Sequence, residues 1–551
     1  METRDLGDAA GDLVVDADVC IVGSGPAGVA VALEVARSGK RVVVLEGGGR
    51  AREPETQALY ALESVGLPFA QAGAERRVRV FGGSSTAWSG RCATFDPVDF
   101  ARRPWVPGSG WPFGPDAVSP HLRAAAKLLR LGPLFERDLG HAWPLFGVPR
   151  PRPELDPATL RTQLWQWSHS PDGGYVNAAR ELWPRLETAR KLTVYLHANA
   201  TSLLTSESGR AVGVRASSLG GRKLWVRAPR VVLACGAIEN ARLLLASRER
   251  RPEGLGNTHG LVGRYLLDHP SPVLGTWPVE VAPRLLDRFG HYWLDDHRGR
   301  HVYAAGVALS ERMQVRRRLP NAAAYLLAEP REDAGWLSLR RLTRGGGGTL
   351  DRAWDALNVL RRPGEIVRAA MRRARHRPEQ LPLRRLALVC NPEQIPSADS
   401  RVTLSEQVDA LGVPTVRVDW RADARERDAA LAMLEVLDRE LPRLGLPRPT
   451  PSPWTRGEGD WREAFVDHAH PMGTTRMATD PRHGVVDPDG EVFDAPGVFV
   501  AGGSVFPTGG TAHPTLMIMA LSTRLGAHLR AALEAERPAS VVSEALVARS
   551  A

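Results

Sequence analysis

A glycine-rich turn near the N-terminus has the residue types and spacing of a phosphate-binding loop. Residues 23–28 read G-S-G-P-A-G and follow a short apolar run at residues 18–22. In a G-x-G-x-x-G turn the first glycine allows the tight turn, the second lets the backbone approach a pyrophosphate, and the third lets helix and strand pack closely. The positive N-terminus of the following helix then faces the phosphates. The turn therefore predicts a dinucleotide cofactor.

An acidic residue stands at the distance where such a cofactor places its ribose. Residues 29–38 have a helical pattern, and a second apolar run at residues 41–46 ends on Glu46, 18 residues after Gly28. A carboxylate at this place accepts hydrogen bonds from the ribose hydroxyls and repels a 2′-phosphate. Strand, turn, helix and strand form a βαβ unit, which favours FAD or NAD over NADP.

Two further glycine-rich segments favour FAD over NAD. Residues 81–88 read F-G-G-S-S-T-A-W, and residues 497–504, G-V-F-V-A-G-G-S, look like a short strand that runs into glycines. A larger, two-part cofactor needs additional segments whose backbone comes close to it. The chain has no second G-x-G-x-x-G to hold NAD(P)H and no C-x4-C, which argues against a disulfide reductase or a flavin monooxygenase. Electrons are then expected to come from the substrate.

With two more segments, the chain resembles the glucose-methanol-choline (GMC) family of FAD-dependent alcohol oxidases and dehydrogenases. These segments are residues 470–477, H-P-M-G-T-T-R-M, and residues 507–516, P-T-G-G-T-A-H-P-T-L. The resemblance runs from about Asp18 to His528 with the motifs in the family's order. It implies an α/β plus antiparallel β architecture: a Rossmann-like FAD-binding domain of the glutathione-reductase type, interleaved with an antiparallel-sheet substrate domain.

The resemblance implies two catalytic histidines, His470 and His513. An alcohol C–H bond gives up hydride only as the O–H loses its proton, so the reaction needs a neutral imidazole near the flavin N5 and a second group that orients the oxygen. We expect His470 to be the principal base and His513 its partner, with the reverse assignment left open. His468 ranks below His470, although an extended segment would send both side chains to one face.

The same resemblance implies the residues that hold the cofactor. They come from all the glycine-rich segments and from the start of the last helix: Gly23, Gly25, Pro26, Ala27, Gly28, Glu46, Gly83, Ser84, Thr86, Ala87, Gly503, Ser504, Pro514 and Thr515. Some family members link FAD covalently to a histidine where this chain has Ala87, so we expect non-covalent FAD. Gly502 stands where many relatives carry Asp. No metal site is expected.

The resemblance also implies how the elements that carry these residues are grouped. The FAD-binding domain would be built from residues 14–100, 185–270 and 465–535. The substrate domain would be built from residues 101–184, which would act as a lid, and residues 271–464. Residues 401–404 and 413–420 alternate between apolar and polar side chains around a polar turn, which predicts an antiparallel pair with one packed face.

Length and composition are those of a multidomain globular enzyme. The chain has 551 residues, 43% hydrophobic and 24% charged, and no apolar run approaches the roughly 20 residues of a membrane-spanning helix. The four cysteines are far apart and form no C-x-x-C pair, which argues against zinc ribbons and dithiol redox motifs. No signal peptide is recognisable, so a cytoplasmic location is expected.

Most of the positive charge lies in one segment. The net charge is +10, and residues 331–385 contain 14 arginines against 6 acids, interleaved with apolar residues. One interpretation is a solvated insertion with a core-facing stripe. The other is docking to an anionic membrane surface or to an acidic electron-accepting partner. No recognition motif accompanies the charge, so no nucleic-acid partner is expected.

These features together predict FAD-dependent oxidation of a CH–OH group to an aldehyde or ketone. The 15 tryptophans slightly favour a sugar or polyol over other small alcohols, because indole faces stack on sugar rings. The electron acceptor, whether O2, a quinone or a redox partner, stays open. Two rivals remain: a lyase of the same fold with structural FAD, of the hydroxynitrile-lyase kind, and a non-catalytic flavin-bound docking protein.

Overall fold

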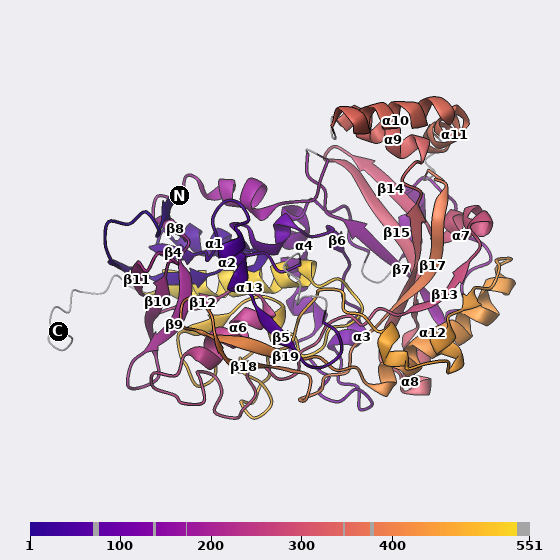
Figure 1. Ribbon diagram of the computed structural model, residues 1–551. Helices are drawn as coiled ribbons and strands as arrows, with labels where there is room; N and C mark the ends of the chain where they lie inside the picture. Colours follow the sequence, from indigo (N-terminus) through magenta and orange to yellow (C-terminus); the bar gives the residue numbers. More distant parts are fainter. Residues whose placement is uncertain (70–75, 136–138, 172, 345–347, 375–378, 537–551) are drawn as a thin grey trace.

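The computed structural model describes residues 1–69, 76–135, 139–171, 173–344, 348–374 and 379–536. Two bodies of structure lie side by side (Figure 1). One is built around a parallel sheet and carries both ends of the described chain, and the other is built around a large antiparallel sheet. The predicted fold class, α/β with antiparallel β, is confirmed.

The parallel sheet has the strand order β1-β8-β4-β3-β12-β21. Its members are β1 (Glu2–Asp5), β8 (Leu192–Leu196), β4 (Val42–Leu45), β3 (Val19–Val22), β12 (Val231–Leu233) and β21 (Val498–Val500). Strands β3 and β4 read VCIV and VVVL and are buried at every position, as expected where helices cover both faces. The strands predicted at residues 18–22 and 41–46 are thus present as parallel neighbours.

Three helices accompany this sheet: α1 (Pro26–Val35), α6 (Ala237–Ala246) and α13 (Thr515–Ala535). Helix α1 follows the glycine turn and confirms the predicted βαβ unit, with a 3-10 turn at Ala36–Ser38. Helix α13 packs closely on α1, and a Cβ added at Gly526 would lie 2.8 Å from the Cβ of Glu34. A second small sheet, of strand order β2-β11-β10-β9, joins β2 (Leu13–Asp16), β11 (Lys223–Arg227), β10 (Ala211–Ser217) and β9 (Asn199–Thr205).

The large antiparallel sheet has the strand order β20-β13-β17-β16-β15-β7-β6, with β14 paired to β15. Its members are β20 (Thr450–Pro451), β13 (Val273–Trp277), β17 (Leu383–Pro392), β16 (Ala322–Pro330), β15 (Gly299–Leu309), β7 (Leu160–Trp167), β6 (Arg91–Cys92) and β14 (His291–Asp296). Helix α12 (Ala424–Arg443) buries Met433, Val436 and Leu437 in the core beside the sheet residues Leu386 and Leu388.

The antiparallel pair predicted at residues 401–404 and 413–420 is confirmed as β18 (Arg401–Val408) and β19 (Pro414–Asp419). This pair does not join the large sheet. Strand β19 pairs in parallel with β5 (Leu62–Ser64), and the apolar face packs on Ile238 of α6. The pair therefore contacts the helix that follows β12 of the parallel sheet.

The remaining helices surround the two bodies. They are α2 (Pro54–Ala58), α3 (Pro97–Phe100), α4 (Ser119–Leu128), α5 (Ala142–Leu145), α7 (Ala282–Phe289), α8 (Glu311–Arg317), α9 (Gly335–Arg344), α10 (Thr349–Arg361) and α11 (Pro363–Ala374). Helices α9 to α11 lie in the basic segment, of which residues 345–347 and 375–378 are outside the described part. Among the described residues, no helix combines the length and apolarity needed to cross a membrane. The domain boundaries stay a prediction.

Candidate active site

The first glycine turn is shaped by contacts that exclude side chains. Gly23 has φ +105°, and a Cβ there would lie 2.5 Å from the Ala234 carbonyl oxygen. A Cβ at Gly28 would lie 2.0 Å from the Gly23 carbonyl oxygen. Pro26 and Ala27 open helix α1, whose N-cap residue Gly25 has no capping side chain. The turn thus holds strand and helix together and leaves the positive helix end uncapped for an anion.

Glu46 lies at the end of β4 and is 6% exposed. One carboxylate oxygen accepts hydrogen bonds from the Ser24 hydroxyl at 2.5 Å and the Ser24 amide at 3.2 Å, and the other accepts one from the Gly48 amide at 2.9 Å. Burial raises the pKa of this carboxyl group, while these donors oppose the rise. A carboxylate has about four acceptor positions, so about one remains here for a ribose hydroxyl.

The second glycine turn lies directly against the first. The Gly82 amide donates to the Ser24 hydroxyl at 2.9 Å, and a Cβ at Gly83 would lie 2.9 Å from the Cα of Gly25. A 3-10 helix runs from Gly83 to Thr86, and the Thr86 hydroxyl donates back to the Gly83 carbonyl oxygen. Ser84 and Ala87 are exposed. Four of the predicted cofactor residues are therefore brought next to the first turn.

The C-terminal pair Gly503 and Ser504 follows strand β21. The Ser504 hydroxyl accepts a hydrogen bond from the Asn240 amide of helix α6 at 3.0 Å. The amides of Gly473 and Thr475 donate to the carbonyl oxygens of Gly503 and Ser504 at 3.1 and 2.9 Å. The segment that follows His470 is thereby fixed to the segment expected to hold the cofactor.

Pro514 and Thr515 lie immediately after His513. Pro514 is the N-cap of helix α13 and Thr515 is its first residue. No side chain caps this helix either, so a second uncapped helix N-terminus begins two residues after a candidate catalytic histidine.

The space beside the backbone of three glycines shows whether a large cofactor could come close to the chain there. A Cβ built at Gly236 meets no atom within 4 Å, and one at Gly25 or Gly502 meets none closer than 3.7 Å. Gly236 is the uncapped N-cap of α6. Gly236 is exposed, Gly25 is half-buried and Gly502 is buried. Gly236 therefore borders open space, and the backbone at Gly25 and Gly502 is not closed off by a tight contact, which suits the close approach of a dinucleotide.

The two predicted catalytic histidines meet, and two more join them. The ring centroids of His470 and His513 are 4.9 Å apart, and the His468 ring lies 5.8 Å from His470 and 6.2 Å from His513. His269, which the sequence analysis did not single out, has its Nδ1 atom 3.1 Å from Nδ1 of His470. Four imidazoles from three distant segments thus form one cluster.

The hydrogen bonds of His269 determine which nitrogen of His470 carries the proton. Nε2 of His269 lies 3.4 and 3.2 Å from the carbonyl oxygens of Gly509 and Gly510, which can only accept, so we assign its proton to Nε2. Nδ1 of a neutral His269 is then an acceptor, and His470 must donate to it from its own Nδ1. A neutral His470 therefore presents an unprotonated Nε2, which is the form a general base requires.

All four imidazoles are held in the neutral form. Burial lowers the pKa of His269 to about 4 and that of His468 to about 3. Burial also lowers the pKa of His470 and His513 well below the usual value, with smaller contributions from neighbouring charges. His513 is 6% exposed, and its Nδ1 has no hydrogen-bond partner among the described residues. The cluster thus contains an unprotonated base and a polar nitrogen available to a ligand.

A buried carboxylate fixes the backbone of the histidine-bearing segments. One oxygen of Asp268 accepts hydrogen bonds from the amides of His269 at 2.7 Å and His468 at 3.0 Å, and the other accepts one from the His470 amide at 2.8 Å. Ala469, between the last two histidines, has φ +61°. The segment is therefore not extended as expected, and His468 and His470 are brought together by a left-handed turn.

Arg91 supplies positive charge near this cluster. Its guanidinium lies over the rings of Tyr325 at 4.0 Å and Trp165 at 4.8 Å, and its charge contributes to the lowered pKa of His513 and His470. No carboxylate forms an ion pair with Arg91 within the described part of the chain. A cation held in this way favours an anionic oxygen near the histidines.

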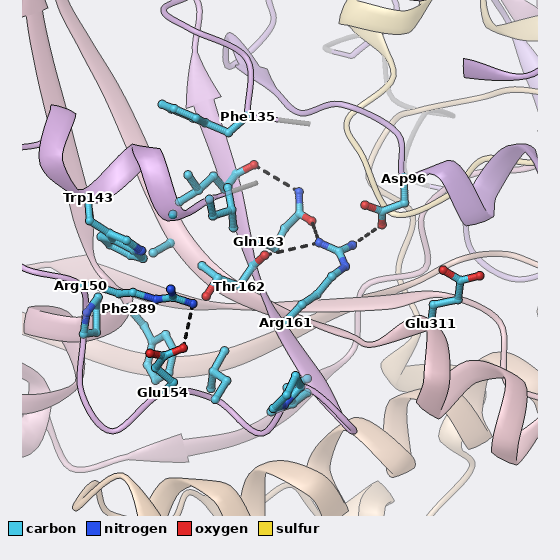
Figure 2. Close-up of a pocket in the computed structure, with 18 of the residues that line it drawn as sticks. Asp96, Phe135, Trp143, Arg150, Glu154, Arg161, Thr162, Gln163, Phe289 and Glu311 are labelled. Atoms are coloured by element: carbon cyan, nitrogen blue, oxygen red, sulfur yellow. Dashed lines mark hydrogen bonds and ion pairs between the residues drawn. The ribbon is translucent and has the colours of Figure 1, made fainter. Parts of the chain in front are cut away.

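A cavity with a volume of about 560 Å³ lies elsewhere in the described structure. It lies against β7 and is lined by Trp143, Phe135 and Phe289 together with the ion pairs Arg161–Asp96 and Arg150–Glu154 (Figure 2). None of the four histidines lines it. We therefore place the candidate active site at the histidine cluster, because the chemistry requires those groups.

One signal could have identified His269 from the sequence. The chain contains three His-Pro dipeptides, beginning at His269, His470 and His513, and all three meet in the structure. A residue before proline is restricted to extended conformations, which limits the orientation of its side chain. Asp268 and Arg91 had no comparable signal, because their roles depend on contacts between distant segments.

Comparisons with known proteins agree with this architecture. Residues 18–375 match the family model of FAD-dependent oxidoreductases, and residues 396–522 match that of GMC oxidoreductases. The first match covers more than half of the chain and places it among the FAD-dependent oxidoreductases. With the second match, the chain belongs to the GMC oxidoreductase family.

Relatives of known name are distant. The 2-methyl-1,2-propanediol dehydrogenase of Mycolicibacterium austroafricanum is 26% identical over an alignment 323 positions long, which covers 47% of this chain and 56% of that protein. The 6‴-hydroxyparomomycin C oxidase of Streptomyces lividus is 26% identical over an alignment 571 positions long, which covers 95% of this chain and 93% of that protein. The alignment to the first relative therefore spans only about half of that protein's length.

Solved structures share the fold. Pyridoxine 4-oxidase from Mesorbium loti superposes with a TM-score of 0.53 at 18% identity, covering 93% of this chain and 99% of that chain. Formate oxidase superposes with a TM-score of 0.55 at 18% identity, covering 95% and 99%. At this identity the likeness concerns the fold alone.

Proposed function

We propose that this protein oxidises a CH–OH group of a small alcohol, sugar or polyol to an aldehyde or ketone, with His470 as general base. The observation that carries the proposal is the unprotonated Nε2 that the His269 hydrogen bonds leave on His470. In its neighbour His513 the buried Nδ1 has no hydrogen-bond partner among the residues that the structure describes. A base and an orienting group at one place are what alcohol oxidation needs.

The proposed cofactor is non-covalently bound FAD, which when bound supplies the acceptor for the hydride. The pyrophosphate would lie at the uncapped start of α1, near Gly25 and Gly28, and the ribose would hydrogen-bond to Glu46. Gly83, Ser84 and Thr86 of the second turn, together with Gly503 and Ser504, would line the rest. The exposed Ala87 offers no nucleophile for a covalent link.

The chain's own groups account for the proton. Nε2 of His470 would take the hydroxyl proton, which leaves His470 with both nitrogens protonated and its Nδ1 still donating to His269. His513 would hold the substrate oxygen through a hydrogen bond. The charge of Arg91 would stabilise the oxygen as it becomes negative. His470 would thus act on the hydroxyl proton, and His513 and Arg91 would act on the substrate oxygen.

The names of the relatives support an alcohol as substrate. One denotes a diol dehydrogenase, and others denote oxidases of hydroxyparomomycin C and of paromamine. The common reaction is oxidation at an oxygen-bearing carbon of a small polar molecule. We therefore keep a sugar, polyol or other small alcohol as the substrate class, and O2, a quinone or a redox partner as the acceptor.

Anaerobic mixing with a panel of alcohols tests the proposal. The FAD-loaded protein is mixed with diols, sugars and aminoglycosides, and the oxidised flavin absorbance is followed. We expect bleaching with at least one member of the panel. If no alcohol bleaches the flavin while the chain cleaves a cyanohydrin, the lyase alternative replaces the oxidation. If neither reaction occurs, the proposed oxidation is wrong.

A further inference from the structure

Helices α9, α10 and α11 form a separate three-helix unit in the basic segment. The unit projects beyond one end of the large antiparallel sheet, on the body that does not carry the chain ends (Figure 1). Helix α9 contacts both α10 and α11. In α10 and α11 the polar side chains are turned inward and apolar ones are exposed, the reverse of an ordinary surface helix. This feature has no part in the proposed oxidation.

Helix α10 buries polar side chains and exposes apolar ones. Asp355 is buried in an ion pair with Arg341 of α9, and the buried Asn358 amide donates to Ser338 of α9 at 3.3 Å. On the other side, Leu350 is 86%, Trp354 56% and Leu360 78% exposed. Positions i, i+4 and i+10 lie on one side of a helix. The exposed side of α10 is therefore an apolar stripe.

Helix α11 repeats the pattern. Val367 and Met371, one turn apart, are 56% and 50% exposed, whereas Ala369 is buried. The Glu365 side chain points toward α9, where it accepts a hydrogen bond from the Gly335 amide at 3.0 Å. Large apolar side chains exposed along the same side of a helix are typical of a surface that contacts a partner or a membrane. We call these exposed apolar residues of the two helices the apolar stripes: Leu350, Trp354 and Leu360 of α10, and Val367 and Met371 of α11.

The stripes are flanked by positive charge. Residues 335–374 contain nine arginines and three carboxylates, a net charge of +6. Two of the carboxylates, Asp355 and Glu365, are engaged within the unit by Arg341 and Arg362. Arg361 and Arg368 are exposed, and no described carboxylate pairs with either. The partner of this surface must therefore be both anionic and able to accept apolar side chains.

We propose that α10 and α11 dock the protein on the surface of an anionic lipid bilayer. Helices with arginines beside exposed Leu and Trp lie in the interface plane, with the apolar side chains among the acyl chains and the charges at the headgroups. A second copy of this chain is disfavoured, because two units of charge +6 repel each other. A nucleic acid offers no apolar volume for Leu350 and Leu360. The contact is peripheral and is independent of the proposed oxidation.

Vesicle flotation of the full-length, FAD-loaded protein tests this proposal. We expect the protein to float with phosphatidylglycerol-containing vesicles and not with pure phosphatidylcholine, and to dissociate as salt is raised. The variant Leu350→Gln/Trp354→Gln/Leu360→Gln removes the stripe of α10, and Arg361→Glu/Arg368→Glu reverses two charges. Each should lower the partition coefficient by at least roughly tenfold while alcohol oxidation stays unchanged.

Matched controls separate docking from the attraction of any basic protein to anionic lipid. Arg222→Glu/Arg250→Glu makes the same charge change on exposed arginines of the other body, and Val14→Gln/Val408→Gln removes exposed apolar side chains there. Both controls should float like the wild type. Absence of flotation, or an equal loss in the controls, contradicts the proposal. Loss of flotation combined with retention on immobilised polyglutamate would also overturn it, in favour of an acidic protein partner.

Discussion

At the scale of single residues, the reactivity proposed for His470 depends on which nitrogen of each neutral imidazole carries the proton. His269 can contact the carbonyl oxygens of Gly509 and Gly510 only through a protonated Nε2, and this assignment fixes the tautomer of His470. The sequence predicted His470 and His513, because each lies in a motif. It missed His269, which is 201 residues from His470 in the chain. The shared His-Pro dipeptide was the only local signal for His269, because its hydrogen bond to His470 follows from the tertiary fold.

Replacing His269 tests the tautomer assignment. In His269→Phe the acceptor for Nδ1 of His470 is lost, so His470 can adopt the other tautomer, in which Nε2 is protonated and cannot act as base. We expect kcat to fall by about 10- to 100-fold with little change in KM or FAD content, because one positioning contact is lost. Steady-state kinetics measure kcat and KM, and flavin absorbance measures the FAD content. The exposed His483→Phe is the matched control, and equal rates in the two variants would remove His269 from the account.

The pH dependence of flavin reduction follows from the buried histidines. A base works only when unprotonated, and burial lowers the pKa of His470 well below its ordinary value of about 6.5. The rate constant should therefore stay level as the pH falls from about 8 to 6, and should decline only at lower pH. Stopped-flow reduction across this range measures it, with circular dichroism as a check on folding. A decline centred near pH 6.5 would show that burial does not lower the pKa of the base.

At the scale of elements, short continuous apolar runs predicted β3 and β4, and alternation predicted the β18–β19 pair. The sequence did not predict which sheet that pair joins. Its neighbour β5 has only three residues, Leu62–Ser64, and three residues have no recognisable period. The sequence also left open whether the apolar side of α10 faces the core or solvent, because an amphipathic pattern shows that a helix has two faces but not which one is buried.

The close approach of strand and helix at the glycine turn gives a prediction at this scale. In Gly28→Ala the new methyl group would lie 2.0 Å from the Gly23 carbonyl oxygen, so α1 must move away from β3. We expect the free energy of unfolding to fall by about 1–3 kcal/mol, as for overpacked cores, and FAD affinity to fall with it. Gly11→Ala is the control, since its methyl group meets no atom within 4 Å. Urea denaturation that gives equal values for both variants would contradict this packing.

At the scale of the whole molecule, the candidate cofactor residues run from Gly23 to Thr515 and yet gather at neighbouring turns. Helices α1 and α13, from opposite ends of the chain, pack together beside the parallel sheet. A cofactor bound across these segments would add its own contacts to the hydrogen bonds and packing that already join them. The sequence motifs marked these segments individually, and the parallel strand order brings them together.

Release of the cofactor tests this arrangement. Because Ala87 stands at the position for a covalent link, acid precipitation should release all flavin into the supernatant. The apoprotein should then melt at lower temperature than the holoprotein, since a ligand at 100 times its Kd stabilises the folded state by about 2.7 kcal/mol. Scanning calorimetry with and without added FAD measures this difference. Flavin retained on the precipitate, or equal Tm values, would contradict non-covalent bridging.

The most direct test of the central claim is stopped-flow flavin reduction by His470→Ala under anaerobic conditions, with full flavin content verified first. Loss of a positioned base typically costs roughly a hundredfold to ten-thousandfold, so the variant should reduce its flavin at least about a hundred times more slowly than the wild type. His513→Asn should keep more activity than His513→Ala, because an amide can still orient the substrate oxygen. Reduction of His470→Ala at the wild-type rate would contradict the account and make His468 the next candidate.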